Sequence, residues 1–233
     1  MKDLCIVIQR FFPKYYQKSL LKKPNLSKPL IDYLSTPLIS QNTLIEEIEF
    51  LVLDFETTGL NASKEKIISI GYTVIKNLHL LASSSRHLLV NPKQLLKEEN
   101  VSIHQLTDDN LQQGVSLQNA MDELFSVMRN RVVVVHFDKI EKNFINHACH
   151  HLYQINRLPM IMLDTLQIEA RKMSRFQGYI QGDNLRLFTL RNKYNLPRYK
   201  AHNAMQDAIA TAELFLAQVD YMGEVKSIKL HQV

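Results

Sequence analysis

The chain has 233 residues, of which 45% are hydrophobic and 22% are charged, and its formal net charge at pH 7 is +5. At roughly 100–200 residues per domain this length excludes two large domains, and a globular composition supports a core without disulfides. Cys5 and Cys149 are too few for a disulfide framework or a four-cysteine zinc site, and no apolar run reaches the roughly 18–20 residues that span a bilayer. We therefore expect a cytoplasmic protein of one ordinary domain with an appendage.

Residues 1–47 are expected to form a basic N-terminal extension. Residues 1–30 hold seven Lys and Arg side chains against Asp3 alone, a charge of +6 that leaves −1 for the rest of the chain. Four of the seven prolines lie within residues 1–37, which predicts interrupted helices and a separately organised extension. Such an arm can bind nucleic acid or an anionic membrane surface, or dock on its own domain. Aromatic and basic residues alternate over positions 11–18, which fits single-strand binding and packing on the domain equally.

Strands and helices alternate after residue 47. The hydrophobic pattern predicts strands at 50–54, 67–75, 78–90 and 131–136, a turn at Lys76 and Asn77, and a short strand at 160–163. Helical patterns cover residues 102–129, 138–153, 185–194 and 204–219. This order predicts an α/β fold whose sheet is covered on both faces. We expect a domain over residues 48–220, followed by a C-terminal tail at 221–233.

Two carboxylates follow the first strand. The strand period of two places Asp54 and Glu56 on one side of the sheet, at the carboxyl end where open α/β sheets bind ligands. Carboxylates this close repel each other unless a hard cation such as Mg²⁺ or Mn²⁺ lies between them. An ordinary polar strand end followed by a turn also fits this pair alone.

A second acidic cluster follows the fourth strand. Glu141 lies near the middle of the inward stripe of the expected helix, so it needs a partner, plausibly the same metal site. Asp138 lies at the edge of that stripe and is more simply read as a helix N-cap.

The third cluster joins a histidine to an aspartate five residues later. Residues five apart on one helix point away from each other, so His202 and Asp207 converge only if His202 precedes the helix. Asn203 followed by Gln206 resembles a capping box, which would start the helix directly after His202. Asp207 then lies on the flank of the buried face and can face a groove.

With these clusters in order, residues 48–219 resemble the DEDDh 3′–5′ exonucleases, the DnaQ-like family that includes the proofreading epsilon subunit of DNA polymerase III. LDFETTG, from position 53, matches the first motif closely, and residues 103–107 are similar to the family's IHGIT element. His202 and Asp207 keep the HxxxxD spacing of the third motif. The resemblance implies a ribonuclease H-like mixed sheet with helices on both faces.

The second motif departs from the family pattern HNxxFDxxFL. Aligning His136 and Phe144-Ile145 with this pattern places Ile140 at its phenylalanine and Glu141 at its aspartate. The alternative register, with Phe137 and Asp138 as the FD pair, aims Asp138 at the edge of the stripe. We prefer Glu141. The replacement of the family's aspartate by glutamate puts in question the geometry of a second metal more than the type of reaction.

The resemblance also implies roles for individual residues. Asp54, Glu56 and Asp207 would hold one divalent ion, Mg²⁺ or Mn²⁺, and Asp54 would bridge to a second ion on which Glu141 acts. His202 would be the general base. The positions that match those holding the terminal nucleotide are Thr57, Thr58, Gly59 and His104.

The resemblance leads us to expect a metal-dependent exonuclease that releases nucleoside 5′-monophosphates from the 3′ ends of single-stranded DNA or RNA. Only 14 residues follow Val219, fewer than a polymerase-binding tail would need, so we expect a free-standing enzyme of DNA repair or RNA turnover. A polymerase or repair protein is a candidate partner. The alternatives are a proofreading subunit and a catalytically silent module that binds nucleic acid.

Overall fold

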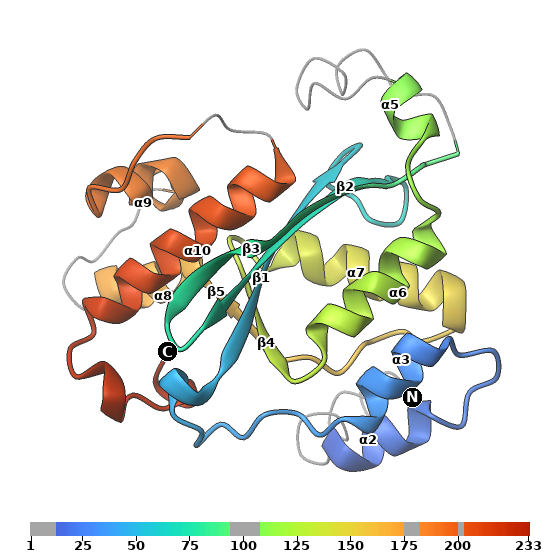
Figure 1. The fold of residues 1–233 in the computed structure, drawn as a ribbon, viewed down its shortest axis with the longest axis horizontal. Helices are drawn as coiled ribbons and strands as arrows, with labels where there is room; N and C mark the ends of the chain where they lie inside the picture. Colours follow the sequence, from blue (N-terminus) through green and yellow to red (C-terminus); the bar gives the residue numbers. More distant parts are fainter. Residues whose placement is uncertain (1–12, 94–107, 175–181, 200–202) are drawn as a thin grey trace.

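One mixed sheet of five strands lies at the centre of the molecule (Figure 1). The computed structural model describes residues 13–93, 108–174, 182–199 and 203–233. β1, β2 and β3 are antiparallel neighbours, whereas β4 is parallel to β1 and β5 is parallel to β4. The order across the sheet is β3-β2-β1-β4-β5, with bounds β1 Glu49–Thr57, β2 Ile67–Lys76, β3 His79–Leu89, β4 Arg131–Val135 and β5 Met162–Asp164.

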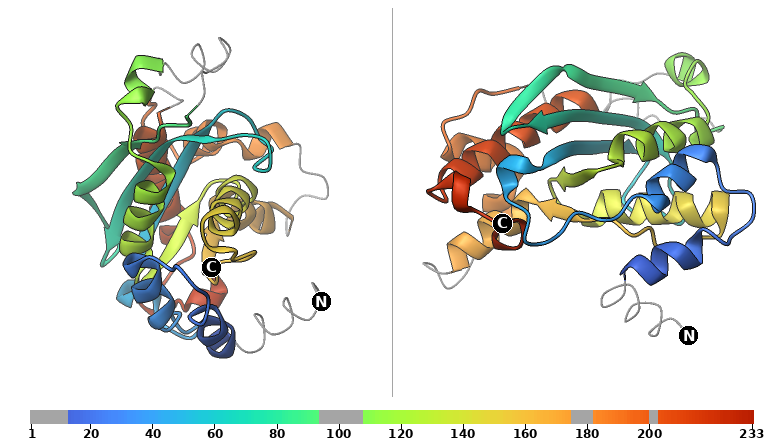
Figure 2. Two further views of the ribbon diagram at one scale, coloured as in Figure 1. Left: turned by 90° about the vertical axis from the view of Figure 1, so that its right-hand side faces the viewer. Right: turned by 60° about the horizontal axis from the view of Figure 1, so that its bottom comes forward.

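Helices cover both faces of the sheet, as predicted (Figures 1 and 2). Alternate residues of β1 enter two different cores, because successive strand side chains point to opposite faces. Leu51, Leu53 and Phe55 pack in the core that includes α6 and α7, and Phe50 and Val52 pack in the core that includes α10. The α-helices after the first strands are α5 Asp108–Gln112, α6 Leu117–Met128, α7 Lys139–Tyr153, α8 Thr165–Ser174, α9 Leu187–Lys193 and α10 Ala204–Asp220. Short 3-10 turns are η1 Ile45–Glu47, η2 Gly182–Leu185, η3 Val225–Ser227 and η4 Leu230–Gln232.

Within residues 48–220, most elements begin and end within a few residues of their predicted positions, with two exceptions. The single helix predicted over 102–129 is wrong: residues 102–107 lie outside the described ones, and the rest contains two helices, α5 and α6. Ser116 starts α6 afresh, because its hydroxyl accepts a hydrogen bond from Asn119 N at 3.1 Å. Helix α8 was missed, since it follows β5 directly without a turn signal.

In the described part of the chain two α-helices precede the sheet, α2 Pro13–Leu20 and α3 Lys28–Ser35, and they are interrupted as predicted, with Pro24 between them and Pro37 after the second. Pro13 and Pro29 lie in first turns, where the missing N–H costs nothing. Tyr16 and Tyr33 are buried in the core of α6 and α7, and the Tyr16 hydroxyl donates to Arg157 O at 2.7 Å. Tyr15 is exposed, so the aromatic residues of this segment do not share one environment.

The last residues of the chain also pack on the sheet. Ile228, Leu230 and Val233 belong to the core that contains α10. Ile45 N donates to Ile228 O at 3.0 Å, which ties this segment to the turn before β1. Across the described ranges, no helix is both long enough and apolar enough to cross a membrane.

Candidate metal centre

Three carboxylates from two distant parts of the chain meet at the carboxyl end of β1. Asp54 and Glu56 share the face of β1 that α10 covers, and Asp207 lies in the first turn of α10. Each offers an oxygen, and the three oxygens lie within 4.8 Å of one another. Glu56 and Asp207 are buried and Asp54 is partly buried. Within the described ranges this is the one group of three or more His, Cys, Asp or Glu side chains close enough to share a metal ion.

A glycine on β2 allows α10 to approach the sheet this closely. Gly71 lies opposite Asp54 in the β1–β2 ladder. A Cβ atom on Gly71 would lie 2.0 Å from Ala204 C and 2.2 Å from Met205 N, both in the backbone of the first turn of α10. Because only glycine fits beneath this turn, the residue controls how near Asp207 comes to Asp54.

Glu141 joins the same site from α7. It is 3% exposed, and its charge helps to raise the pKa of Asp54, so the two carboxylates lie close together. Burial raises the pKa of Glu141 to about 8, although hydrogen bonds from its own backbone N–H and that of Phe55 lower it. The bond to Phe55 places this carboxylate beside β1, and its Oε2 atom has no hydrogen-bond partner in the described part of the protein.

Asp138, three residues before Glu141, has partners of its own. It occupies the N-cap position of α7, as expected, but its side chain makes no capping hydrogen bond. It pairs with Lys142 at 3.4 Å and accepts from Gln167 Nε2 at 3.3 Å. Of these two residues, Glu141 is the one whose charge raises the pKa of Asp54, although it lies outside the group of three carboxylates whose oxygens converge within 4.8 Å.

Asp164, at the end of β5, holds the start of α7. The sequence analysis did not single it out. Its Oδ1 accepts from Phe137 N at 2.8 Å and from Leu166 N at 2.9 Å, and its Oδ2 accepts from Asp138 N at 3.1 Å. This buried carboxylate thereby fixes the turn that carries Glu141. The only signal in the sequence is an acidic residue at the end of a short strand.

A second residue that the sequence analysis missed is His87 on β3. Its Nε2 lies 2.7 Å from Ser69 Oγ, and Ser69 is the ladder partner of Glu56. Burial lowers the pKa of His87, while the charge of Glu56 raises it, so the imidazole lies near the carboxylates. Nothing in the spacing of the strand marks this histidine, because the long-range pairing of β2 and β3 brings it there.

The third motif has the predicted local structure in its described part. Asn203 caps α10, and its Oδ1 accepts from Gln206 N at 3.1 Å. The helix begins at Ala204, so that its cap, Asn203, is the residue that follows His202 in the sequence. His202 itself lies outside the described residues, as does His104.

The chain before His202 is tied to the two helices beside it. Arg191 is 1% exposed, and its guanidinium donates to Ala210 O at 2.5 Å, Pro197 O at 2.7 Å and Glu213 Oε2 at 2.7 Å. Tyr199 donates to the other oxygen of Glu213 at 2.7 Å. These bonds fix residues 197–199 against α9 and α10.

The candidate substrate residues Thr57, Thr58 and Gly59 form the turn after the two β1 carboxylates. The Thr57 hydroxyl donates to Gly59 O at 2.9 Å. The Thr58 hydroxyl donates to Glu65 Oε2 at 2.5 Å and accepts from Lys66 N at 2.9 Å. The turn is thus held by its own side chains at the edge of the carboxylate site.

The electrostatics of the site fit a divalent cation. Burial raises the pKa of Asp54 well above its ordinary value, and the charges of Glu141, Glu56 and Asp207 raise it further. Like charges so placed are stable together when protonated or when they share a metal ion. The unpartnered Oε2 of Glu141 is a further oxygen that a cation would satisfy. The residues present therefore fit Mg²⁺ or Mn²⁺, which prefer oxygen ligands.

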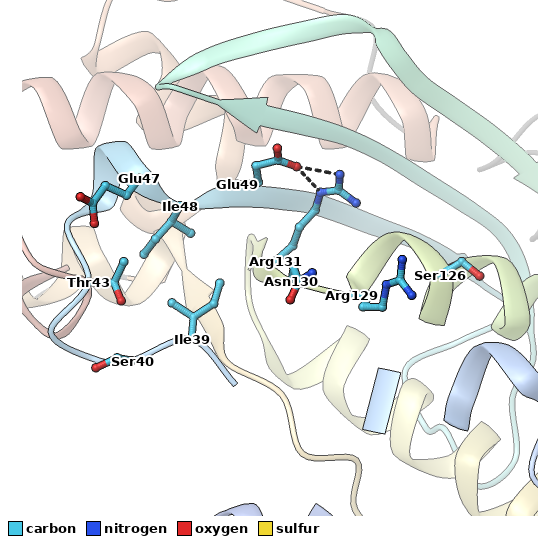
Figure 3. A pocket seen from close by; sticks show the side chains of 10 residues that line it. All are labelled: Ile39, Ser40, Thr43, Glu47, Ile48, Glu49, Ser126, Arg129, Asn130 and Arg131. Carbon is cyan, nitrogen blue, oxygen red and sulfur yellow. Dashed lines mark hydrogen bonds and ion pairs between the residues drawn. The ribbon is translucent and has the colours of Figure 1, made fainter. Parts of the chain in front are cut away.

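A cavity of about 530 Å³ lies far from this site, at the other end of the sheet (Figure 3). It is bordered by Glu49 at the start of β1 and Arg131 at the start of β4, which form an ion pair at 2.7 Å. Both charges are already satisfied, so this cavity does not compete as the reaction site.

The comparisons with known proteins agree with this geometry. The RNase_T family model, described as exonuclease, matches residues 51–215. DNA polymerase III PolC-type of Thermotoga petrophila is 26% identical over 196 residues, covering 84% of this chain and 14% of that protein. The corresponding protein of Bacillus subtilis is 28% identical over 188 residues, covering 81% of this chain and 12% of its own length. The chain thus spans about an eighth of the length of these relatives.

Solved structures share the fold. The nuclease domain of 3′hExo, a DEDDh family member bound to rAMP, has a TM-score of 0.65 at 12% identity and covers 80% of this chain and 98% of that one. A complex of Escherichia coli ExoI with single-stranded DNA has a TM-score of 0.63 at 14% identity, covering 77% of this chain and 42% of that one. At these low identities the similarity shows the fold alone. This fold is a mixed sheet of the ribonuclease H-like 3′-exonuclease type, as expected.

Proposed function

The chain belongs to the DEDDh exonuclease family, and from this membership and the carboxylate site we propose that it is a metal-dependent 3′–5′ exonuclease. Its substrates would be the 3′ ends of single-stranded DNA or RNA, and its products nucleoside 5′-monophosphates. The relatives support this substrate class, since one solved neighbour is a complex with single-stranded DNA.

One observation carries the proposal. Asp54, Glu56 and Asp207 converge within 4.8 Å, and Glu141 adds a fourth buried carboxylate whose charge acts on Asp54. Four acidic groups in one place oppose folding unless their charge serves a ligand. A phosphodiester is itself an anion, so a site with this charge suits it only with divalent cations bound.

The residues have distinct proposed roles. Asp54, Glu56 and Asp207 would hold one divalent ion, and Asp54, whose pKa all three other carboxylates raise, would hold a second together with Glu141. Two divalent ions can stabilise both the attacking and the leaving oxygens of an in-line displacement at phosphorus. His202 would accept the proton of the attacking water, a role suited to a side chain that titrates near neutral pH. Thr57, Thr58, Gly59 and His104 would hold the terminal nucleotide.

A direct assay tests this function. Purified protein is incubated with a 5′-labelled single strand and Mg²⁺ or Mn²⁺; we expect a ladder of strands shortened from the 3′ end, which a chelator abolishes. Asp54→Asn should remove the ladder. Binding of the strand without a ladder in either metal would instead support the catalytically silent module.

Two matched variants separate the acidic residues of α7. Glu141→Asp should retain the ladder, because it keeps the carboxylate and restores the residue of the family motif. Glu141→Gln should lose it, whereas Asp138→Asn should keep it, because Asp138 pairs with Lys142 and is not among the carboxylates whose charges act on Asp54. Loss of activity in Asp138→Asn with Glu141→Gln unaffected would reverse the assignment.

A proofreading role is the second candidate, because the similarity to PolC-type polymerases covers most of this chain. A proofreading exonuclease acts on the mispaired 3′ end of a primer. Faster removal of a mispaired than a paired terminus, and co-purification with a polymerase, would favour this role. Equal rates on paired, mispaired and single-stranded ends without such a partner would favour a free-standing enzyme.

A further inference from the structure

An exposed aromatic side chain follows the carboxyl end of β4. Phe137 comes two residues after the end of β4 and four residues before Glu141, and 40% of it is exposed. β4 runs parallel to β1 with Val134 opposite Val52, so Phe137 lies past the carboxyl edge of the sheet, close to the level of the site. An exposed ring at this place is open to a strand that approaches the carboxylates.

The backbone of Phe137 is in a conformation that bulky residues avoid. Its φ is 73°, in the left-handed region where asparagine is enriched and an aromatic residue is an outlier. Asp164 holds it there, since Oδ1 accepts from the Phe137 N–H at 2.8 Å. The family motif has asparagine at this position, and this chain has phenylalanine. The chain thus carries a ring where the backbone favours a small polar residue, and strain of this kind is typical of functional sites.

A cation lies over the same ring. Lys139 Nζ is 5.8 Å from the centroid of Phe137, and both side chains are exposed. An aromatic ring beside a cation is the combination that binds single strands: bases stack on the ring without sequence preference, and the cation attracts the backbone. We propose that Phe137 is a stacking platform for one nucleobase of the substrate strand. The inference rests on the proposed function for its substrate but adds a contact that the family motif lacks.

Phe137→Leu tests the stack, because leucine keeps an apolar side chain but removes the ring. Binding is measured as the Kd for a single strand that contains 2-aminopurine, in the presence of a chelator. We expect this Kd to rise roughly 5- to 100-fold, and the KM in Mg²⁺ to rise by a similar factor. The effect on kcat should be smaller. The matched control is Tyr221→Leu, an aromatic residue 66% exposed at the opposite end of α10 from Asp207. This control should leave both constants unchanged.

An abasic scan locates the base. Strands that lack a base at the first, second or third nucleotide from the 3′ end should bind the wild type more weakly at one of these positions. At that position Phe137→Leu should cause no further loss. Equal affinity of wild type and Phe137→Leu for every strand overturns the proposal.

Phe137→Asn separates stacking from a structural role. Relief of the backbone strain should raise the Tm, while loss of the ring should weaken binding. A lower Tm with unchanged Kd would show that the ring serves the fold and would overturn the proposal. If the wild type binds strands but yields no ladder, the proposed exonuclease function is contradicted. The stacking proposal is still tested in that case, because it depends on the Kd values.

Discussion

Gly71→Ala is the substitution whose effect follows most directly from the packing of the site. The added methyl would lie 2.0 Å from the Ala204 carbonyl carbon, and real Cβ atoms essentially never come within 3.0 Å of such a neighbour. The obstacle is backbone on both sides, so no side-chain rotation relieves it. The first turn of α10 must therefore move away from β2 by about 1 Å or more, and Asp207 moves with it.

Both the activity and the stability should suffer. A displacement of about 1 Å at a catalytic group can reduce the rate roughly 100-fold, so we expect a fall in kcat of this order and weaker binding of Mn²⁺. Overpacking costs about 1–3 kcal/mol, which for a chain of this size lowers the Tm by roughly 2–4 °C per kcal/mol.

A matched glycine provides the control. A Cβ atom on Gly182 meets nothing within 4 Å, so Gly182→Ala should change neither kcat nor metal affinity. Thermal unfolding, Mn²⁺ titration and the ladder assay measure all three quantities. If Gly71→Ala keeps the kcat and Mn²⁺ affinity of the wild type, the close approach of α10 does not position Asp207, and the reasoning fails.

Three further predictions concern charge. Burial raises the pKa of Glu141 to about 8 from 4.5, so the folded metal-free protein holds a proton that the unfolded chain releases, and its stability should fall as pH rises from about 4.5 to 8. Thermal unfolding in the presence of a chelator at several pH values measures how stability depends on pH. Glu141→Gln should reduce this dependence, and an unchanged dependence in that variant would contradict the prediction. Mg²⁺ at 100 times its Kd should stabilise the wild type by about 2.7 kcal/mol, because it binds the folded state and not the unfolded chain. If the Tm does not change on adding Mg²⁺, this preference for the folded state is contradicted. Arg191→Met should lower the free energy of unfolding in a urea titration by roughly 1–3 kcal/mol, because it removes the donor to two backbone carbonyl groups and to one oxygen of Glu213, whereas the exposed Arg198→Met should cost little; equal losses would contradict the role of the buried guanidinium.

Much of the site was predictable because local patterns fix it. The strand period places Asp54 and Glu56 on one face, and helical periodicity points Glu141 inward. The cap at Asn203 starts α10 where the histidine motif requires it. Each of these inferences needs only a short segment and a period, so each survives without knowledge of the tertiary structure.

The residues that escaped prediction depend on contacts between distant segments. Asp164 matters because β5 lies beside β4, and His87 matters because β3 pairs with β2 opposite Glu56. Gly71 matters through the backbone of α10, more than 130 positions along the chain. The two short helices that start at Pro13 and Lys28 escaped prediction, because the effect of a proline depends on whether it falls in the first turn or the interior of a helix.

The most direct test of the metal centre is to count and locate the ions it binds. Crystals of the wild type soaked in Mn²⁺ should show anomalous density for two ions roughly 3.5–4 Å apart, ligated by Asp54, Glu56, Asp207 and Glu141. Asp54→Asn crystals treated in the same way should lose this density. Wild-type crystals without manganese at these carboxylates, at concentrations that support cleavage, would contradict the account.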